Sequence, residues 1–157
     1  MEKLIKSAQS SPLMAIEILY GGKTVKFNLY KELKIDENTI NSDLENQPQI
    51  YGFITMLHNY FVKATKAAEK DKDESYGKAI ERLLTSTGSI YYKERSNYPP
   101  ANLAKELAKK DKFYLKKYQK VIDMADTRDR LKNIVESFEQ RASLMQTISA
   151  NIRKDRS

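Results

Sequence analysis

Cysteine and tryptophan are both missing from this sequence of 157 residues. Without cysteine the chain can form no disulfide, zinc–thiolate site or thiol nucleophile, which fits a reducing cytosol. No apolar run approaches the roughly 20 residues that span a bilayer. A single histidine, with no paired carboxylates, nucleophile–base pair or phosphate-binding loop, offers little with which to build an active site. We therefore expect a cytoplasmic protein that is not an enzyme and has no cofactor, metal site or membrane partner.

Charge is abundant, and it is unevenly placed. The chain has 28 basic and 21 acidic residues, which give a net charge of +7. Residues 1–60 carry 6 basic and 7 acidic groups, whereas residues 61–157 carry 22 and 14. A basic region of this kind favours a polyphosphate or an acidic protein surface as partner.

Near the start of the sequence, two runs with strand character flank Gly21 and Gly22. Residues 14–20 form the first run, and the second, residues 23–29, alternates apolar and polar side chains. Both glycines can adopt the positive φ of a tight primed turn, so the segment predicts an antiparallel β-hairpin. A hairpin alone is marginally stable, and it must pack on helices or pair with another chain.

The rest of the sequence predicts helices. A polar connector over 31–48 ends at Pro48, and Asn97–Pro100 is a firm break because proline and its preceding residue leave helical geometry. Between and after these points we predict helices over 49–70 and 76–93, with a charged turn at 70–75. A further helix follows the break and runs to about residue 125. The fold class is thus mainly α: an antiparallel, coiled-coil-like bundle of long helices with an N-terminal β-hairpin. Its domains would be 1–47, the hairpin and connector, and 48–157, a basic helical domain for oligomerisation and nucleic-acid binding.

A row of lysines is the most distinctive pattern in the predicted helix that follows the break and runs to about residue 125. Its members step by 4, 3, 4 and 4 residues and so share one helical face: Lys105, Lys109, Lys112, Lys116 and Lys120. Such a row can follow a phosphate backbone by displacing its counterions. The alternative is an ordinary solvated helix face.

Aromatic and cationic residues are interleaved just before the Asn97–Pro100 break: Tyr91, Tyr92, Lys93, Arg95 and Tyr98. Proteins that bind single strands use this mixture, because aromatic faces stack on bases while Arg and Lys hold phosphates. The alternative is that Tyr91 and Tyr98 belong to the core and the remainder to the surface.

The last part of the chain has apolar residues at alternating spacings of 3 and 4, a heptad seam interrupted by one arginine. The seam, a predicted oligomer interface, consists of Leu131, Ile134, Phe138, Arg141, Met145 and Ile148. Its helix either starts afresh at Asp126 or continues from the preceding one. For Arg141 we predict an ion pair with an acidic residue of a neighbouring helix. The alternative is contact with an acidic partner or nucleic acid in a central cavity.

A set of residues occurs in a definite order along the chain: the run Glu32–Asp36, Leu44, Tyr51, Leu57, Tyr60, the pair Tyr91–Tyr92, Asp111, and the closing helix with Ile134, Phe138, Arg141, Met145 and Ile148. This order resembles that of the UvsY-type recombination mediator proteins of tailed phages, over about residues 31–153.

The resemblance implies a small, mostly helical, ring-forming homo-oligomer that binds single-stranded DNA. It further implies contacts with a phage single-strand-binding protein and a RecA-like recombinase, which such mediators help to load in the host cytoplasm. Lys78 and Arg82 would contact DNA, and the closing helix around Arg141 would serve assembly. The alternative function is a phage-encoded helical protein–protein module, an adaptor or an inhibitor of a host enzyme, that uses its basic face and hairpin edge.

Overall fold

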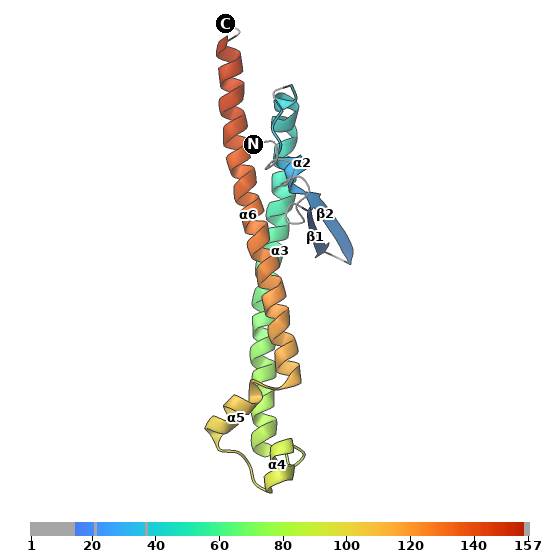
Figure 1. The fold of residues 1–157 in the computed structure, drawn as a ribbon, viewed down its shortest axis with the longest axis vertical. Coiled ribbons are helices and arrows are strands. Elements are labelled where there is room, and N and C mark those ends of the chain that lie inside the picture. The colour runs from blue at the N-terminus through green and yellow to red at the C-terminus, as the bar shows by residue number, and fades with distance from the viewer. Residues whose placement is uncertain (1–14, 21, 37, 156–157) are drawn as a thin grey trace, which may run out of the picture. The chain divides into compact units, whose positions relative to one another are not determined.

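The computed structural model describes residues 15–20, 22–36 and 38–155. The elements follow in the order β1 (Ala15–Tyr20), β2 (Lys23–Asn28), α2 (Leu29–Leu33), α3 (Ile40–Thr85), α4 (Ile90–Arg95), α5 (Ala101–Ala108) and α6 (Lys112–Asp155). α3 and α6, of 46 and 44 residues, supply most of the structure (Figure 1). The predicted mainly α fold of long, packed helices with an N-terminal hairpin is confirmed.

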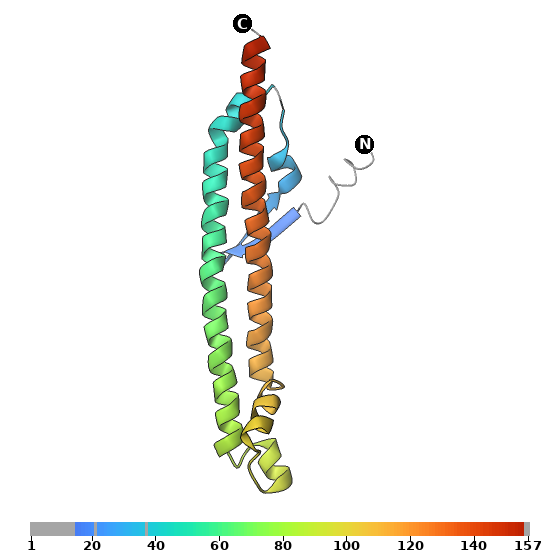
Figure 2. The same ribbon diagram turned by 90° about the vertical axis from the view of Figure 1, so that its left-hand side faces the viewer.

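The chain divides into two compact units, which we call the terminal unit (residues 1–59 and 129–157) and the middle unit (residues 60–128). Each takes a segment of α3 and a segment of α6, and in each the two segments run antiparallel and side by side (Figure 2). α3 crosses the predicted domain boundary after residue 47 without a break.

The predicted hairpin is confirmed. β1 and β2 pair antiparallel in a register that sets Tyr20 opposite Lys23 and Glu17 opposite Lys26. The Lys26 Nζ lies 2.6 Å from a Glu17 carboxylate oxygen on the exposed face, while Ile18 on the other face is buried. Gly22 has the positive φ, 76°, that the turn requires. Met14 and Gly21 of this prediction lie outside the described residues.

α3 is longer than predicted at both ends. It begins at Ile40, runs through Pro48, and continues through the charged stretch 70–75 as far as Thr85, so the predicted connector end and charged turn were wrong. The charged stretch stays helical because Lys and Glu are good helix formers, and because Lys70 and Glu74 lie one turn apart, 3.9 Å between their charged atoms.

The predicted helix over 76–93 is in fact two helices. α3 ends at Thr85, and α4 starts after Ser89, whose Oγ accepts a hydrogen bond from the Tyr92 N–H at 3.3 Å. Serine is a strong N-cap residue, and its position here explains the restart. α4 ends at Arg95, and Ser96 follows as its C-cap with φ 55°. No helix covers residues 97–100, so the predicted break before α5 is confirmed.

The lysine-rich helix is also interrupted. α5 ends at Ala108 and α6 begins at Lys112, so Lys105 and Lys109 do not share a helix with the other three lysines, and the single five-lysine face was wrong. α6 then continues through Asp126 to Asp155, as the second of the two predicted alternatives had it.

The two units differ in what they bury. In the terminal unit the buried apolar side chains are mostly large: Ile18, Ile40, Ile54, Leu57, Leu131, Ile134, Phe138 and Met145. In the middle unit they are Phe61 and the alanines Ala68, Ala79, Ala104 and Ala108. Several large apolar residues of the middle unit are exposed instead, among them Ile90, Leu103 and Tyr118.

Candidate nucleic-acid interface

Positive charge is concentrated in the middle unit. Its sequence holds 16 basic and 10 acidic residues, a net charge of +6, whereas the rest of the chain holds 12 and 11. All predicted nucleic-acid-binding residues belong to this unit: Lys78, Arg82, Tyr91, Tyr92, Lys93, Arg95, Lys105, Lys109, Lys112, Lys116 and Lys120. The middle unit is therefore where a polyanion would be attracted.

An exposed phenyl ring stands among these cations. Phe113, in the first turn of α6, is 66% exposed. The guanidinium carbon of Arg82, from α3, lies over the ring at 6.0 Å from its centroid. Sequence reasoning missed Phe113, because the predicted continuous helix gave its position no special role.

Asp111 fixes this arrangement. One carboxylate oxygen accepts hydrogen bonds from the backbone N–H groups of Phe113 at 2.9 Å and Tyr114 at 3.2 Å, and so caps α6. The other oxygen lies 2.9 Å from Nη2 of Arg82. The same side chain thus starts the helix that carries the phenyl ring and holds the guanidinium beside it. The available sequence signal was Asp111 itself, because aspartate is a favoured N-cap residue.

Two open grooves meet at Arg82 and Phe113, which line both. The first, of about 500 Å³, is otherwise lined by Asp71, Glu74, Ser75, Lys78 and Lys117. The second, of about 600 Å³, has apolar lining residues such as Leu83, Ile90 and Leu107. Its charged lining residues are Glu94, Lys110, Asp111 and Lys112. Of the predicted residues, the grooves thus gather Lys78, Arg82, Tyr91 and Lys112. The remaining seven line neither groove.

The row of lysines survives in shortened form on α6. At about 100° per residue, Lys112, Lys116 and Lys120 fall within about 80° of one another, and Phe113 lies next to that row. All three lysines are exposed. Lys117, on the other side of Phe113, pairs with Asp71 of α3 at 3.2 Å. The phenyl ring is therefore flanked by cations on both sides.

The predicted tyrosines take part in ring contacts of the middle unit. The rings of Tyr92 and Tyr98 are 4.7 Å apart, and the guanidinium of Arg95 lies over Tyr91 at 5.4 Å. The Tyr98 hydroxyl donates to the Thr85 carbonyl at 3.3 Å, although its side chain is still 42% exposed. These contacts attach α4 to the end of α3, and they leave Tyr91 and Tyr92 half-buried.

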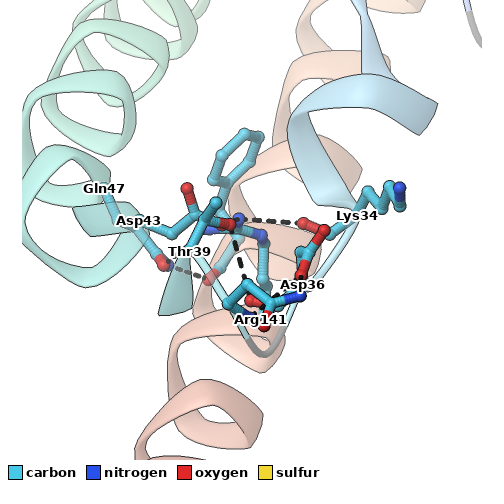
Figure 3. Close-up of polar contacts among 8 residues, drawn as sticks. Lys34, Asp36, Thr39, Asp43, Gln47 and Arg141 are labelled. Atoms are coloured by element: carbon cyan, nitrogen blue, oxygen red, sulfur yellow. Dashed lines mark hydrogen bonds and ion pairs between the residues drawn. The ribbon is translucent and has the colours of Figure 1, made fainter. Parts of the chain in front are cut away.

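Arg141 has the structural role that the sequence predicted. Its Nη2 lies 3.1 Å from a carboxylate oxygen of Asp43 on α3 and 3.0 Å from the Lys34 carbonyl, and its Nη1 donates to the Gln47 side-chain oxygen at 3.1 Å (Figure 3). Gln47 in turn donates to the Phe138 carbonyl at 2.7 Å. The arginine therefore ties α6, α3 and the segment before α3 together within the terminal unit.

The predicted oligomer interface is largely occupied by the chain's own core. Leu131, Ile134, Phe138 and Met145 are buried without any second copy present, whereas Ile148 is only partly covered. Self-association through this seam stays a prediction. The four buried side chains are at most 3% exposed, so a second copy could contact the seam at Arg141 and Ile148.

No family model matches the chain, and no curated protein or solved structure is similar to it. The resemblance to UvsY-type mediators therefore rests on the order and spacing of residues alone. No helix of the described residues is both long and apolar enough to cross a membrane. Within the same residues, no three His, Asp or Glu side chains gather in a way that could hold a metal ion.

Proposed function

We propose that the protein is a non-catalytic, single-stranded-DNA-binding protein whose middle unit contacts the strand. The observation that carries the proposal is the exposed ring of Phe113, bordered by Arg82, Lys112 and Lys117. Bases of a single strand offer π faces to such a ring, and their phosphates are attracted to the surrounding cations.

The distribution of apolar side chains supports the same role. The middle unit leaves large apolar residues in water, including Ile90 at 75% exposure, while it buries mainly alanines. Exposed apolar surface rimmed by charge is typical of binding sites. Duplex DNA keeps its bases stacked inside, so a surface of this kind favours a single strand over a duplex.

The wider function that we propose is that of an oligomeric recombination mediator, which helps to load a RecA-like recombinase in phage recombination and repair. This part rests on the resemblance to UvsY-type proteins. An oligomer would present several weak sites to one strand, and avidity would then raise the overall affinity.

Fluorescence anisotropy of a labelled single-stranded oligonucleotide tests the proposal, with unlabelled duplex of the same length as competitor. We expect binding that weakens steeply with salt and that the duplex displaces poorly. Absence of binding at low salt would contradict the proposal. In that case the basic surface would serve an acidic protein partner, as in an adaptor or inhibitor. Pull-down with the parent protein, compared with pull-down by a variant whose basic surface is neutralised, would then identify such a partner.

A further inference from the structure

A stripe of exposed apolar side chains runs along one face of α6 in the middle unit. It consists of Leu115, Tyr118 and Ile122, each of which is at least 38% exposed. Their spacings of 3 and 4 residues place the three side chains within about 60° of one another on the helix. The stripe is therefore a short heptad seam of the kind by which helices pair, yet its residues are left exposed.

Charged residues beside the stripe make it complementary to a second copy of itself. Lys112, Gln119 and Asp126 are exposed, and steps of seven residues place them in one row next to the stripe. The cation lies at the N-terminal end of this row and the carboxylate at its C-terminal end. Lys116 and Asp123, which are exposed in the next row round the helix, repeat that order. Both rows therefore have opposite charges at their two ends.

We propose that α6 contacts α6 of a second copy of this chain along this stripe, with the two helices antiparallel about a two-fold axis near Gln119. The proposal rests on the proposed function for the expectation that copies associate, and it names a surface through which they join. This surface differs from the predicted seam of α6, whose large side chains are buried in the core of the terminal unit.

The apolar and the charged residues select the same register. In an antiparallel contact about this axis, Leu115 of one copy lies beside Ile122 of the other, and the two copies of Tyr118 lie next to each other. The same register brings Lys112 of each copy beside Asp126 of the other. Parallel helices would instead set lysine against lysine and aspartate against aspartate. Because like charges repel, the charge pattern favours the antiparallel orientation.

The contact leaves the basic surface of the middle unit accessible to a strand. Lys116, Lys120 and Phe113 lie farther round α6 from the stripe than the row of Lys112 and Asp126 does. The two-fold axis keeps this row on the same side of the contact in both copies. The basic surfaces of two copies would therefore adjoin, so that one strand can bind both with increased avidity.

Sedimentation velocity of the full chain, without nucleic acid and at low salt, measures this contact. We expect a monomer–dimer equilibrium with a dissociation constant between about 1 µM and 1 mM, because three apolar side chains from each copy bury little area. Leu115→Ser should weaken the association about 10-fold, since it removes an apolar side chain from both copies. Leu144→Ser is the control and should leave it unchanged, because Leu144 is a similarly exposed leucine of α6 in the terminal unit.

Exchange of charges tests the register. Asp126→Lys should weaken the association at least about 10-fold, because both symmetric pairs become repulsive, and Lys112→Asp should do the same. The double variant, Lys112→Asp with Asp126→Lys, restores both pairs with their signs exchanged and should recover the association of the parent. Glu81→Lys changes the net charge as much as Asp126→Lys does. It lies at an exposed position of α3 in the same unit and should have no effect.

Three results would overturn the contact: a parent protein that stays monomeric over this range, an Asp126→Lys variant that associates like the parent, or a double variant as weak as the single ones. Helical circular dichroism of each variant checks that the fold is retained. Since no nucleic acid is present, a monomeric parent that still binds the labelled strand would overturn the contact alone. Intact self-association without strand binding would overturn the proposed function and support the contact.

Discussion

Arg141 joins three segments of the terminal unit through one side chain that is only 9% exposed. Its replacement by methionine keeps much of the volume, but it leaves Asp43 and Gln47 without their cationic partner. Because the Asp43 side chain is 30% exposed, water takes over part of the lost interaction. We expect Arg141→Met to lower the free energy of unfolding by about 2–3 kcal/mol, measured from urea midpoints.

Arg130, also on α6 but exposed, is the control for this prediction. Arg130→Ala should change the free energy of unfolding by no more than about 0.5 kcal/mol. Equal effects of the two substitutions would show that Arg141 does not hold the terminal unit together.

We expect Tyr51 to make the stability of the terminal unit depend on pH in the alkaline range. Its hydroxyl donates to a Glu139 carboxylate oxygen at 2.7 Å, and this hydrogen bond, together with desolvation and the carboxylate charge, raises the pKa of Tyr51 above its usual value. Its stabilising contribution is therefore complete below the unfolded pKa near 10 and is lost as pH rises through the folded pKa.

We accordingly expect the parent protein to lose more stability than Tyr51→Phe between pH 9 and the alkaline limit of about pH 11. Thermal unfolding of both proteins across this range measures the difference. Parallel pH profiles would mean that the Tyr51–Glu139 hydrogen bond does not contribute.

Single residues were predictable from the sequence when their partners followed from helix periodicity. Arg141 interrupts an apolar seam, and a buried cation in a seam needs an acid, which the structure supplies as Asp43. Phe113 could not be found in this way. Its exposure depends on where α6 begins. The side chain of Asp111 sets that point by capping the helix, and the sequence alone does not tell whether capping or continuation of the preceding helix is favoured.

At the scale of elements, glycines inside α3 are positions where substitution by alanine should stabilise the protein. Gly77 is an interior helical residue, and a Cβ added there would meet no heavy atom within 4 Å. Because glycine loses more backbone entropy than alanine in a helix, Gly77→Ala should raise the free energy of unfolding by about 0.5–1 kcal/mol.

For Gly22 we expect substitution by alanine to destabilise the protein, although a Cβ added there would also meet no heavy atom within 4 Å. Its φ of 76° is unfavourable for alanine, so Gly22→Ala should lower the free energy of unfolding by about 1 kcal/mol. Chemical denaturation of both variants beside the parent measures the pair. The same sign for both changes would contradict this assignment of backbone conformations.

Helix existence was better predicted than helix length. Charged residues at 70–75 were interpreted as a turn, but they form i,i+4 and interhelical pairs such as Lys117 with Asp71, which favour a continuous helix. Pro48 was interpreted as a stop, yet it lies inside α3. Proline gives up one helical hydrogen bond, a loss of about 3 kcal/mol that the packing of a long helix can offset.

At the scale of the whole molecule, the two units differ in their buried apolar core and in their net charge. The terminal unit holds the large apolar core and the Arg141 contacts, whereas the middle unit holds +6 of the +7 net charge and most of the exposed large apolar residues. Composition alone predicted the charge asymmetry. The grouping of residues 1–59 with 129–157 could not be predicted, because it depends on how two helices of more than forty residues pair.

The central claim, that the middle unit is the surface that binds a single strand, is tested most directly by the salt dependence of binding in two charge-matched variants. One variant replaces Lys112, Lys116 and Lys120 by glutamine in the middle unit. The other makes the same replacement at Lys23, Lys31 and Lys132, which are exposed lysines of the terminal unit. Both lose three positive charges.

For each variant, the logarithm of the binding constant for a single-stranded oligonucleotide is plotted against the logarithm of salt concentration. Each lost phosphate contact reduces the slope by about 0.7, so the middle-unit variant should lose about 2 from its slope while the terminal-unit variant keeps that of the parent. Equal slopes for the two variants would contradict the claim, because the affinity would then depend on the total charge of the protein and not on the lysines of the middle unit.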